Sequence, residues 1–229
     1  PKTRSRDKAK QTYIERHTKY DILYLNEVEF SKESRVFTVL QKVFNLKQEA
    51  FEFSSLEIVT LSHEDAHAFY SKYHYLGPQR RSGVHYGVRA NSLTIGCCTF
   101  SRFHRHEQVA KYGEDAVELS RFCLSPIVDK KNLGSWFLSR CLRMLEKTVV
   151  VSFADKQQGH TGALYKACNF SFSHEVAADY YYMDEKGYRL HKKTVWNRSR
   201  KMRMTESEYA AKHALTRVSD DGKTCSVWK

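Results

Sequence analysis

The chain has 229 residues, of which 41% are hydrophobic and 13% aromatic, enough for one substantial core but not enough to demand two full domains. Its 38 lysines and arginines against 26 aspartates and glutamates give a net charge of +12, which favours a polyanionic partner. No apolar stretch approaches the roughly 18 residues of a membrane-spanning helix, and no apolar run follows the basic N-terminus, so we expect neither a membrane protein nor a secreted one.

Residues 1–55 differ from the rest of the chain and are expected to form a basic N-terminal extension or small module. They begin with a charged stretch, and residues 35–53 carry apolar side chains, among them Val36, Leu40 and Val43, at roughly helical spacing. From Leu56 the pattern becomes that of a compact α/β unit.

That unit begins with a strand and a capped helix. Residues 56–61 (LEIVTL) predict the strand. Ser62, with Asp65 three positions later, is typical of an N-cap, and the helix that it starts is expected to stop at Gly77-Pro78. Residues 83–100 then predict an antiparallel hairpin around an asparagine-containing turn.

Further strands and helices follow in alternation. Residues 117–125 (VELSRFCLS) predict a strand, and after Pro126 a helix begins at about Asn132. The apolar run at 149–151 feeds a polar, glycine-containing turn that opens into a short helix, and residues 179–191 predict a hairpin. We therefore expect one α/β core over residues 56–191.

The segment 192–229 is expected to be a basic C-terminal arm and helix. Thr205 and Glu208 form a capping box for a helix over residues 206–218. Before that helix, residues 186–203 are rich in lysine and arginine, with Trp196 among them. This mixture suits phosphate contact and base or sugar stacking, although a solvated charge run is the alternative. The predicted nucleic-acid-binding residues are Lys192, Lys193, Trp196, Arg198, Arg200, Lys201 and Arg203.

The cysteines are expected to be buried thiols in a reducing cytosol. They lie mostly within apolar strand or helix patterns, without the CxxC spacing of a zinc site or the density of a secreted disulfide scaffold. Nor do the histidines, including the pair His104 and His106, accompany a recognised ligand spacing, so no metal is predicted.

The order of elements resembles the GNAT acyltransferase fold, an α/β fold with a mixed, mostly antiparallel central sheet flanked by helices. Residues 124–138 (LSPIVDKKNLGSWFL) resemble the segment of that family whose glycine-rich loop and helix N-terminus bind coenzyme A, and residues 163–170 (ALYKACNF) resemble the stretch that carries its proton-donating tyrosine. The loop departs from the family pattern because it holds Asp129, Lys130, Lys131 and only one glycine, Gly134, which disfavours tight wrapping around a pyrophosphate.

A closer resemblance is to the Mom family of bacteriophage DNA-modification proteins. It rests on four stretches in this order: YHYLG, ELSRFCLSP, NLGSWFLSRCLR and SFADKQQGHTGALYKACNF. The resemblance implies conversion of adenine in DNA to its N6-carbamoylmethyl form, which shields the phage genome from restriction, and hence a protein of the host bacterial cytoplasm acting on double-stranded DNA.

Four residues are the catalytic candidates. Asp155 lies at the end of a strand, where open α/β sheets place ligands, and within the resemblance becomes a general base or an orienter of the attacking amine; a turn or N-cap aspartate is the alternative. Tyr165 coincides with the proton-donating tyrosine, or is simply core.

Arg121 and Ser135 complete that set. Arg121 shares an alternating face with Val117, Leu119 and Cys123, where a buried cation needs an anionic partner. That partner is either structural, with Asp155 or the neighbourhood of Glu118 as the candidates, or a phosphate of the substrate. Ser135 lies in the first turn of a helix, where a hydroxyl can bind an anion or oxyanion, although first-turn serines are common.

Four further residues are the substrate-binding candidates. His74 and Tyr75 close the first core helix, at a location that faces the acceptor in GNAT-like folds. Gly134 of the donor-binding loop and His160, close to Asp155 in sequence, are the other two.

Three functions remain open at this point. The first is a transferase acting on the exocyclic amine of adenine in DNA, which requires a flipped or unpaired base. The second is a coenzyme A-dependent N-acetyltransferase of a protein or small amine, and the third is a nucleic-acid-binding module that has lost catalysis.

The carbamoylmethyl product constrains the donor. Acetyl transfer gives the wrong connectivity, whereas a glycyl ester attacked by the adenine amine gives a product with the right atoms, which can rearrange through a five-membered ring. We therefore expect glycyl-tRNA as the co-substrate, with acyl-coenzyme A as the alternative and no tightly bound cofactor.

Overall fold

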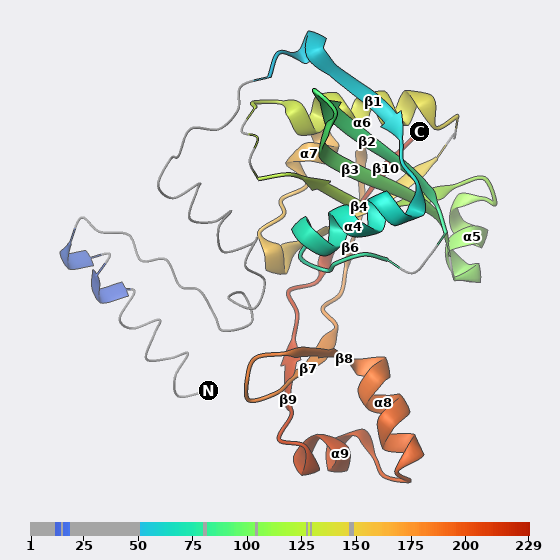
Figure 1. The fold of residues 1–229 in the computed structure, drawn as a ribbon. Helices are drawn as coiled ribbons and strands as arrows, with labels where there is room; N and C mark the ends of the chain where they lie inside the picture. The colour runs from blue at the N-terminus through green and yellow to red at the C-terminus, as the bar shows by residue number, and fades with distance from the viewer. Residues whose placement is uncertain are drawn as a thin grey trace.

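The structure is a computed structural model that describes residues 12–14, 16–18, 51–79, 82–103, 105–126, 128, 130–146 and 149–229 (Figure 1). Most of the expected N-terminal module, including its helix, lies outside these residues, as do His104 and Asp129. Among the described residues, no helix is long and apolar enough to cross a membrane.

The described residues form a central sheet of seven strands in the order β1-β2-β3-β4-β5-β10-β6. Neighbouring strands run antiparallel except β4 and β5, which form a parallel pair. This mixed, mostly antiparallel sheet with flanking helices is a GNAT-like α/β fold, as the sequence predicted. The strands are β1 (Leu56–Thr60), β2 (Val84–Ala90), β3 (Leu93–Arg102), β4 (Val117–Leu124), β5 (Val150–Asp155), β6 (Ser171–Val176) and β10 (Lys223–Trp228).

Helices cover both faces of this sheet. Helix α4 (His63–Tyr73) packs on one face, and α6 (Leu133–Met144) and α7 (Ala163–Ala167) pack on the other. Because successive strand residues point to opposite faces, Cys97 of β3 is buried beneath α4 and its neighbour Cys98 beneath α6. The predicted cap of α4 is confirmed, since the Ser62 hydroxyl accepts a hydrogen bond from the backbone N–H of Asp65 (3.0 Å).

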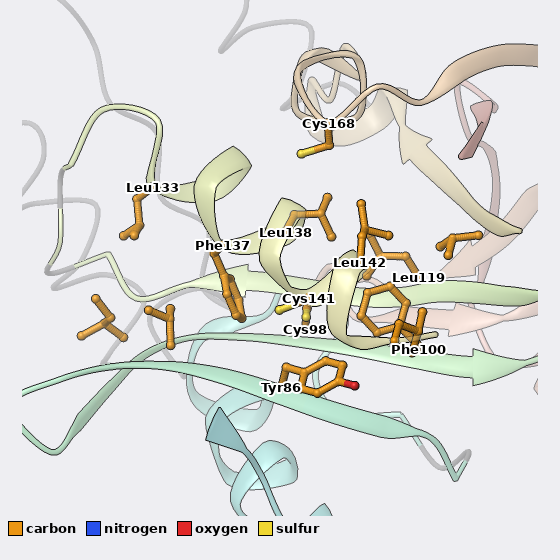
Figure 2. Packing of buried hydrophobic residues seen from close by; sticks show 14 of the residues in the cluster. Tyr86, Cys98, Phe100, Leu119, Leu133, Phe137, Leu138, Cys141, Leu142 and Cys168 are labelled. Atoms are coloured by element: carbon orange, nitrogen blue, oxygen red, sulfur yellow. The ribbon is translucent and has the colours of Figure 1, made fainter. Parts of the chain in front are cut away.

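The larger core lies between α6 and the sheet (Figure 2). Helix α6 presents apolar side chains at i, i+1, i+4 and i+5, which gives it one buried face. Burial of each such side chain contributes roughly 1.5–3 kcal/mol to stability. Figure 2 shows this face, Phe137, Leu138, Cys141 and Leu142, against the sheet residues Tyr86, Cys98, Phe100 and Leu119.

Strand β4 contains a bulge near its middle. Thr99 of β3 pairs with Arg121, but the next residue of β3, Phe100, pairs with Leu119, so Ser120 is an extra residue without an opposite partner. A bulge of this kind reverses the alternation of side chains along the strand.

The bulge corrects one expectation. Val117 and Leu119 belong to the core beneath α6, whereas Arg121 bonds to the loop after α4 and Cys123 packs on the α4 side. Arg121 therefore shares its face with Cys123, as expected, but not with Val117 and Leu119. A bulge moves the side chains after it to the other face, and period-2 counting cannot detect it.

Residues 177–222, called the lobe below, form a second unit inserted between the neighbouring strands β6 and β10. The lobe has a three-stranded sheet in the order β8-β7-β9, with a small core around Tyr182, Val195 and Tyr209. In Figure 1 it lies below the central sheet, in orange and red. Its elements are β7 (Tyr180–Met183), β8 (Arg189–His191), α8 (Lys192–Lys201), α9 (Glu206–Lys212) and β9 (Thr216–Ser219).

This arrangement differs from the expected division at residue 191. The hairpin β7–β8 lies in the lobe, and the last strand, β10, returns to the central sheet between β5 and β6. The capping box of Thr205 and Glu208 is present, but α9 ends at Lys212, because the chain turns at Ala214 (φ 51°) and continues as β9.

The first and last residues of the lobe, 177–179 and 220–222, connect it to β6 and β10 and are called the neck below. The Asp220 carboxylate accepts hydrogen bonds from the backbone N–H groups of Asp179 (2.8 Å) and Gly222 (2.9 Å). Gly222 has φ +74°, and a Cβ there would lie 2.5 Å from the carbonyl oxygen of Val176, so only glycine fits.

The remaining helical segments are short. Helix α5 (His106–Tyr112) connects β3 to β4, and the 3-10 turns η1 (Phe53–Ser55) and η2 (Lys156–Gln158) precede β1 and follow β5.

Candidate active site

The parallel pair β4–β5 separates soon after it begins, and this separation creates a cavity. Val117 pairs with Val150 and Glu118 with Val151, but beyond these two pairs β4 continues beside β3 and β5 continues beside β10. A cavity of about 410 Å³ opens where the strands diverge. Six of the predicted site residues line it: His74, Tyr75, Arg121, Asp155, His160 and Tyr165.

A hydrogen bond joins two of the residues that line this cavity, Asp155 and Tyr75. Asp155 is the last residue of β5 and is only 7% exposed. The hydroxyl of Tyr75, in the loop after α4, donates a hydrogen bond to its Oδ2 atom (3.0 Å). Burial and the negative charge of Asp155 raise the pKa of Tyr75, so this hydroxyl keeps its proton.

Aromatic rings surround that hydrogen bond. The rings of His74 and Tyr75 are stacked with centroids 4.8 Å apart, and His160 meets Tyr75 edge-on at 5.9 Å. His74 Nδ1 accepts a hydrogen bond from the backbone N–H of Leu76 (3.1 Å), which fixes its ring orientation. One side of the cavity is thus an aromatic wall with polar edges.

Tyr165 reaches the cavity from α7. Gly162 directly precedes this helix, and its φ of +79° lets the chain turn sharply out of the loop after β5. The Tyr165 ring is half-buried and packs on Phe170 with centroids 5.5 Å apart. Burial raises the pKa of Tyr165, and a hydrogen bond with the Ser152 hydroxyl partly opposes the increase. Tyr165 is therefore a protonated phenol at neutral pH.

Arg121 lies in the cavity wall at the bulge of β4. Its Nε donates to the carbonyl oxygen of Gly77 (3.1 Å), and its NH1 nitrogen donates to the carbonyl oxygen of Ser120 (2.7 Å). Arg121 thereby ties the loop that carries Tyr75 to β4, and its positive charge opposes the increase in the pKa of Tyr75.

Ser135 and Gly134 lie outside the cavity lining, in the first turn of α6. The Ser135 hydroxyl donates to the carbonyl oxygen of Asn132 (3.1 Å). A Cβ on Gly134 would lie 3.3 Å from Leu164 and 3.8 Å from Phe122, both of which line the cavity. The start of α6 is therefore directly behind the cavity wall.

Several lining residues were not singled out from the sequence. Ser120 and Phe122 come from β4, on either side of Arg121. Lys223 comes from β10, where it pairs in register with Asp155. No local pattern identifies Lys223, because its position depends on the return of the chain from the lobe.

The predicted nucleic-acid-binding residues all lie on α8 and the turn after it, outside the cavity lining. Lys192 is engaged within the lobe, since its Nζ forms a salt bridge with Asp179 (2.6 Å). Trp196 is 42% exposed, and the guanidinium of Arg200 lies 4.9 Å from the centre of its ring.

The cysteines are free thiols, and all but the partly exposed Cys123 are buried. Within the described ranges, no group of three or more His, Cys, Asp and Glu residues is arranged to hold a metal ion.

Comparison with protein families gives a match over most of the chain. The model of the Mom protein family matches residues 55–222, which include the central sheet up to its last strand, the cavity residues other than Lys223, and the lobe. No curated protein sequence matches the chain.

Solved structures of acetyltransferases are similar to this chain at low sequence identity. The ribosomal-protein-S18-alanine N-acetyltransferase from Escherichia coli is 11% identical, with 75% of this chain and 92% of that chain covered and a TM-score of 0.46. A putative acetyltransferase from Salmonella typhimurium, solved with its cofactor acetyl-CoA, is 14% identical, with coverages of 76% and 94% and a TM-score of 0.46. The IAA acetyltransferase from Bacillus cereus is 11% identical, with coverages of 76% and 98% and a TM-score of 0.45.

Proposed function

The chain belongs to the Mom protein family, and we propose that it is a transferase that converts adenine in DNA to its N6-carbamoylmethyl form and so protects the DNA from restriction. The observation that carries this proposal is the convergence of Asp155, Tyr75 and Tyr165 in one cavity between β4 and β5. A buried carboxylate can act as the general base and a protonated phenol as the general acid in acyl transfer to an amine.

The acceptor is an adenine that has left the base stack. Its N6 amine is paired inside a duplex, so the base must be flipped into the cavity before it can react. The stacked rings of His74 and Tyr75, with His160 at their edge, offer a surface on which a purine can lie. Asp155, held by Tyr75, then takes a proton from the attacking amine.

The donor is a glycyl ester, and glycyl-tRNA is the abundant one in cells. The N6 amine attacks the ester carbonyl, the bond to the ribose oxygen breaks, and Tyr165 gives that oxygen its proton. The product carries N6–C(O)–CH2–NH2. Its free amine attacks C6 through a five-membered ring and expels the original nitrogen as an amide, which leaves N6–CH2–C(O)–NH2 with the same atoms.

Arg121 and the start of α6 complete the assignment. Arg121 lines the cavity with a permanent positive charge, so we assign it to stabilising the anionic oxygen that forms at the carbonyl. Ser135 and Gly134 lie behind the cavity wall, and we assign them to holding the donor. The basic residues of α8 are assigned to nucleic acid.

Reconstitution tests this function. Purified protein is incubated with duplex DNA and glycyl-tRNA labelled in its glycine, with acetyl-coenzyme A, or with uncharged tRNA, and the nucleosides are analysed by mass spectrometry. We expect labelled N6-carbamoylmethyladenine only with glycyl-tRNA, and none with the Asp155→Asn variant. Product without charged tRNA, or product without label, would rule out this donor.

A further inference from the structure

Helix α8 has one face fixed in the lobe and another turned outward. Val195 and Ser199, one turn apart, are buried in the lobe. At 100° per residue, Asn197 lies on the opposite side of the helix, flanked by Lys193, Arg200 and Lys201. These four side chains are all exposed and make up what is called the outward face below.

The charge of α8 is unbalanced. Residues 192–203 contain six basic residues and no acidic one. In the part of the chain that the structure describes, the cations of the outward face form no salt bridge, whereas two acidic groups of the lobe are engaged elsewhere: Glu206 accepts from Tyr182, and Glu208 caps α9. The electrostatic potential of the outward face is therefore positive, which suits binding of a polyanion.

The outward face also carries groups that can read bases. An asparagine amide pairs with the N6 and N7 edge of adenine, and an arginine with the O6 and N7 edge of guanine. Arg200 is partly positioned for such a contact, because its guanidinium lies against the ring of Trp196. With ten residues, α8 is about 15 Å long, a length that fits across the major groove of B-form DNA.

We propose that α8 is a recognition helix that enters the major groove of duplex DNA, with Asn197 and Arg200 contacting base edges and Lys193 and Lys201 contacting phosphates. The proposal rests on the proposed function for its choice of DNA as partner. A double-stranded RNA does not fit, because the major groove of the A-form is too deep and narrow for side chains to read.

The position of the lobe links this contact to the cavity. The neck ends at Gly222, and the next residue, Lys223, lines the cavity and pairs with Asp155. Hydrogen bonds between Asp179 and Asp220 hold the two segments of the neck together. DNA bound to α8 is thus held by an element that is attached at the edge of the candidate active site. The base contacts of α8 would therefore determine which DNA sequences are modified.

Selection from a random duplex library tests this inference without any catalysis. Wild-type protein should enrich a defined sequence, and Asn197→Ala should change that sequence without changing the charge of the helix. The enriched duplex is then made with 7-deazaguanine, which removes only the N7 acceptor in the major groove. We expect wild-type binding to weaken tenfold or more, and binding by Arg200→Ala to be the same for both duplexes.

Arg198→Ala is the matched control. Arg198 is exposed on the same helix and carries the same charge, but lies away from the outward face. Its loss should weaken binding to both duplexes by the same factor and preserve the effect of 7-deazaguanine. A sequence preference unchanged by Asn197→Ala and Arg200→Ala, or equal competition by an RNA duplex of the same sequence, would overturn the proposal.

The two proposals can fail separately. DNA binding that depends on the outward face, without modified adenine, would remove the proposed function and leave this inference. If Asn197→Ala and Arg200→Ala still modify adenine, and in the same DNA sequences as the wild type, the inference about α8 fails and the proposed function stands.

Discussion

The Tyr75 hydroxyl donates a 3.0 Å hydrogen bond to Asp155, and so joins the loop after α4 to the end of β5, two segments 80 residues apart in the chain. A carboxylate held in this way is restricted to one orientation, and the stacked ring of His74 restricts the tyrosine in turn. This relationship leads to the first prediction.

Tyr75→Phe should lower the rate of modification about tenfold to a hundredfold, because a hydrogen bond to a charged group contributes roughly 1.5–3 kcal/mol. The phenyl ring preserves the stacking, so binding of DNA should be unchanged. Single-turnover rates and DNA affinity measured on the same variant separate the two effects. An unchanged rate would show that Asp155 does not need this partner.

Tyr165→Phe should reduce the rate by about a hundredfold or more, since it removes a general acid. Tyr165 must be protonated to act as the general acid, and burial raises its pKa. Ionisation of Tyr165 should therefore not lower the wild-type rate up to about pH 9. Initial rates across this range test the point. A fall centred near neutral pH and absent from the variant would contradict the assignment.

Ser135→Ala should raise the KM for glycyl-tRNA by a larger factor than it lowers kcat. Ser135 lies at the start of α6, behind the cavity wall, and is assigned to binding glycyl-tRNA rather than to contacting the reacting atoms. Steady-state kinetics with the donor varied provide the measurement. A loss confined to kcat would instead place Ser135 at the reacting carbonyl.

Stability should fall in alkaline solution because buried cysteines, among them Cys97 and Cys123, have raised pKa values. Burial raises the pKa of Cys97 and of Cys123 from about 9 to about 12. The unfolded chain releases these protons at lower pH than the folded chain does. The contribution of the two thiols to the free energy of unfolding is therefore complete below about pH 9 and is lost as the pH rises toward 12. Each thiol adds a slope of at most about 1.4 kcal/mol per pH unit.

Urea unfolding at a series of pH values above 8.5 measures that slope, and the range is kept below that in which tyrosines ionise, about pH 10. The double variant Cys97→Ala, Cys123→Ala should be less stable overall and show a shallower slope. Equal slopes for the two proteins would mean that the thiols are not the cause.

Local patterns predicted much of the fold. Strands β1 to β5 follow from apolar and β-branched runs, and the caps at Ser62 and Thr205 follow from residues three positions apart. Asp155 and Tyr165 could be placed in one site because a single turn connects β5 to α7. Such features depend on neighbours in the sequence.

Features that depend on distant pairing could not be predicted. The bulge at Ser120 is defined only against β3, and it decides which face Arg121 occupies. Lys223 enters the cavity because β10 is inserted between β5 and β6 after a 46-residue excursion through residues 177–222. The separation of β4 from β5, which creates the cavity, also has no signature in either strand alone.

The most direct test of the central claim is mass spectrometry of the nucleosides in DNA from bacterial cells that express the protein. The account predicts N6-carbamoylmethyladenine in DNA from cells with the wild-type chain, and none in DNA from cells with an equally abundant Asp155→Asn variant. Adenine that stays unmodified when the folded wild-type chain is present and binds DNA would contradict the claim.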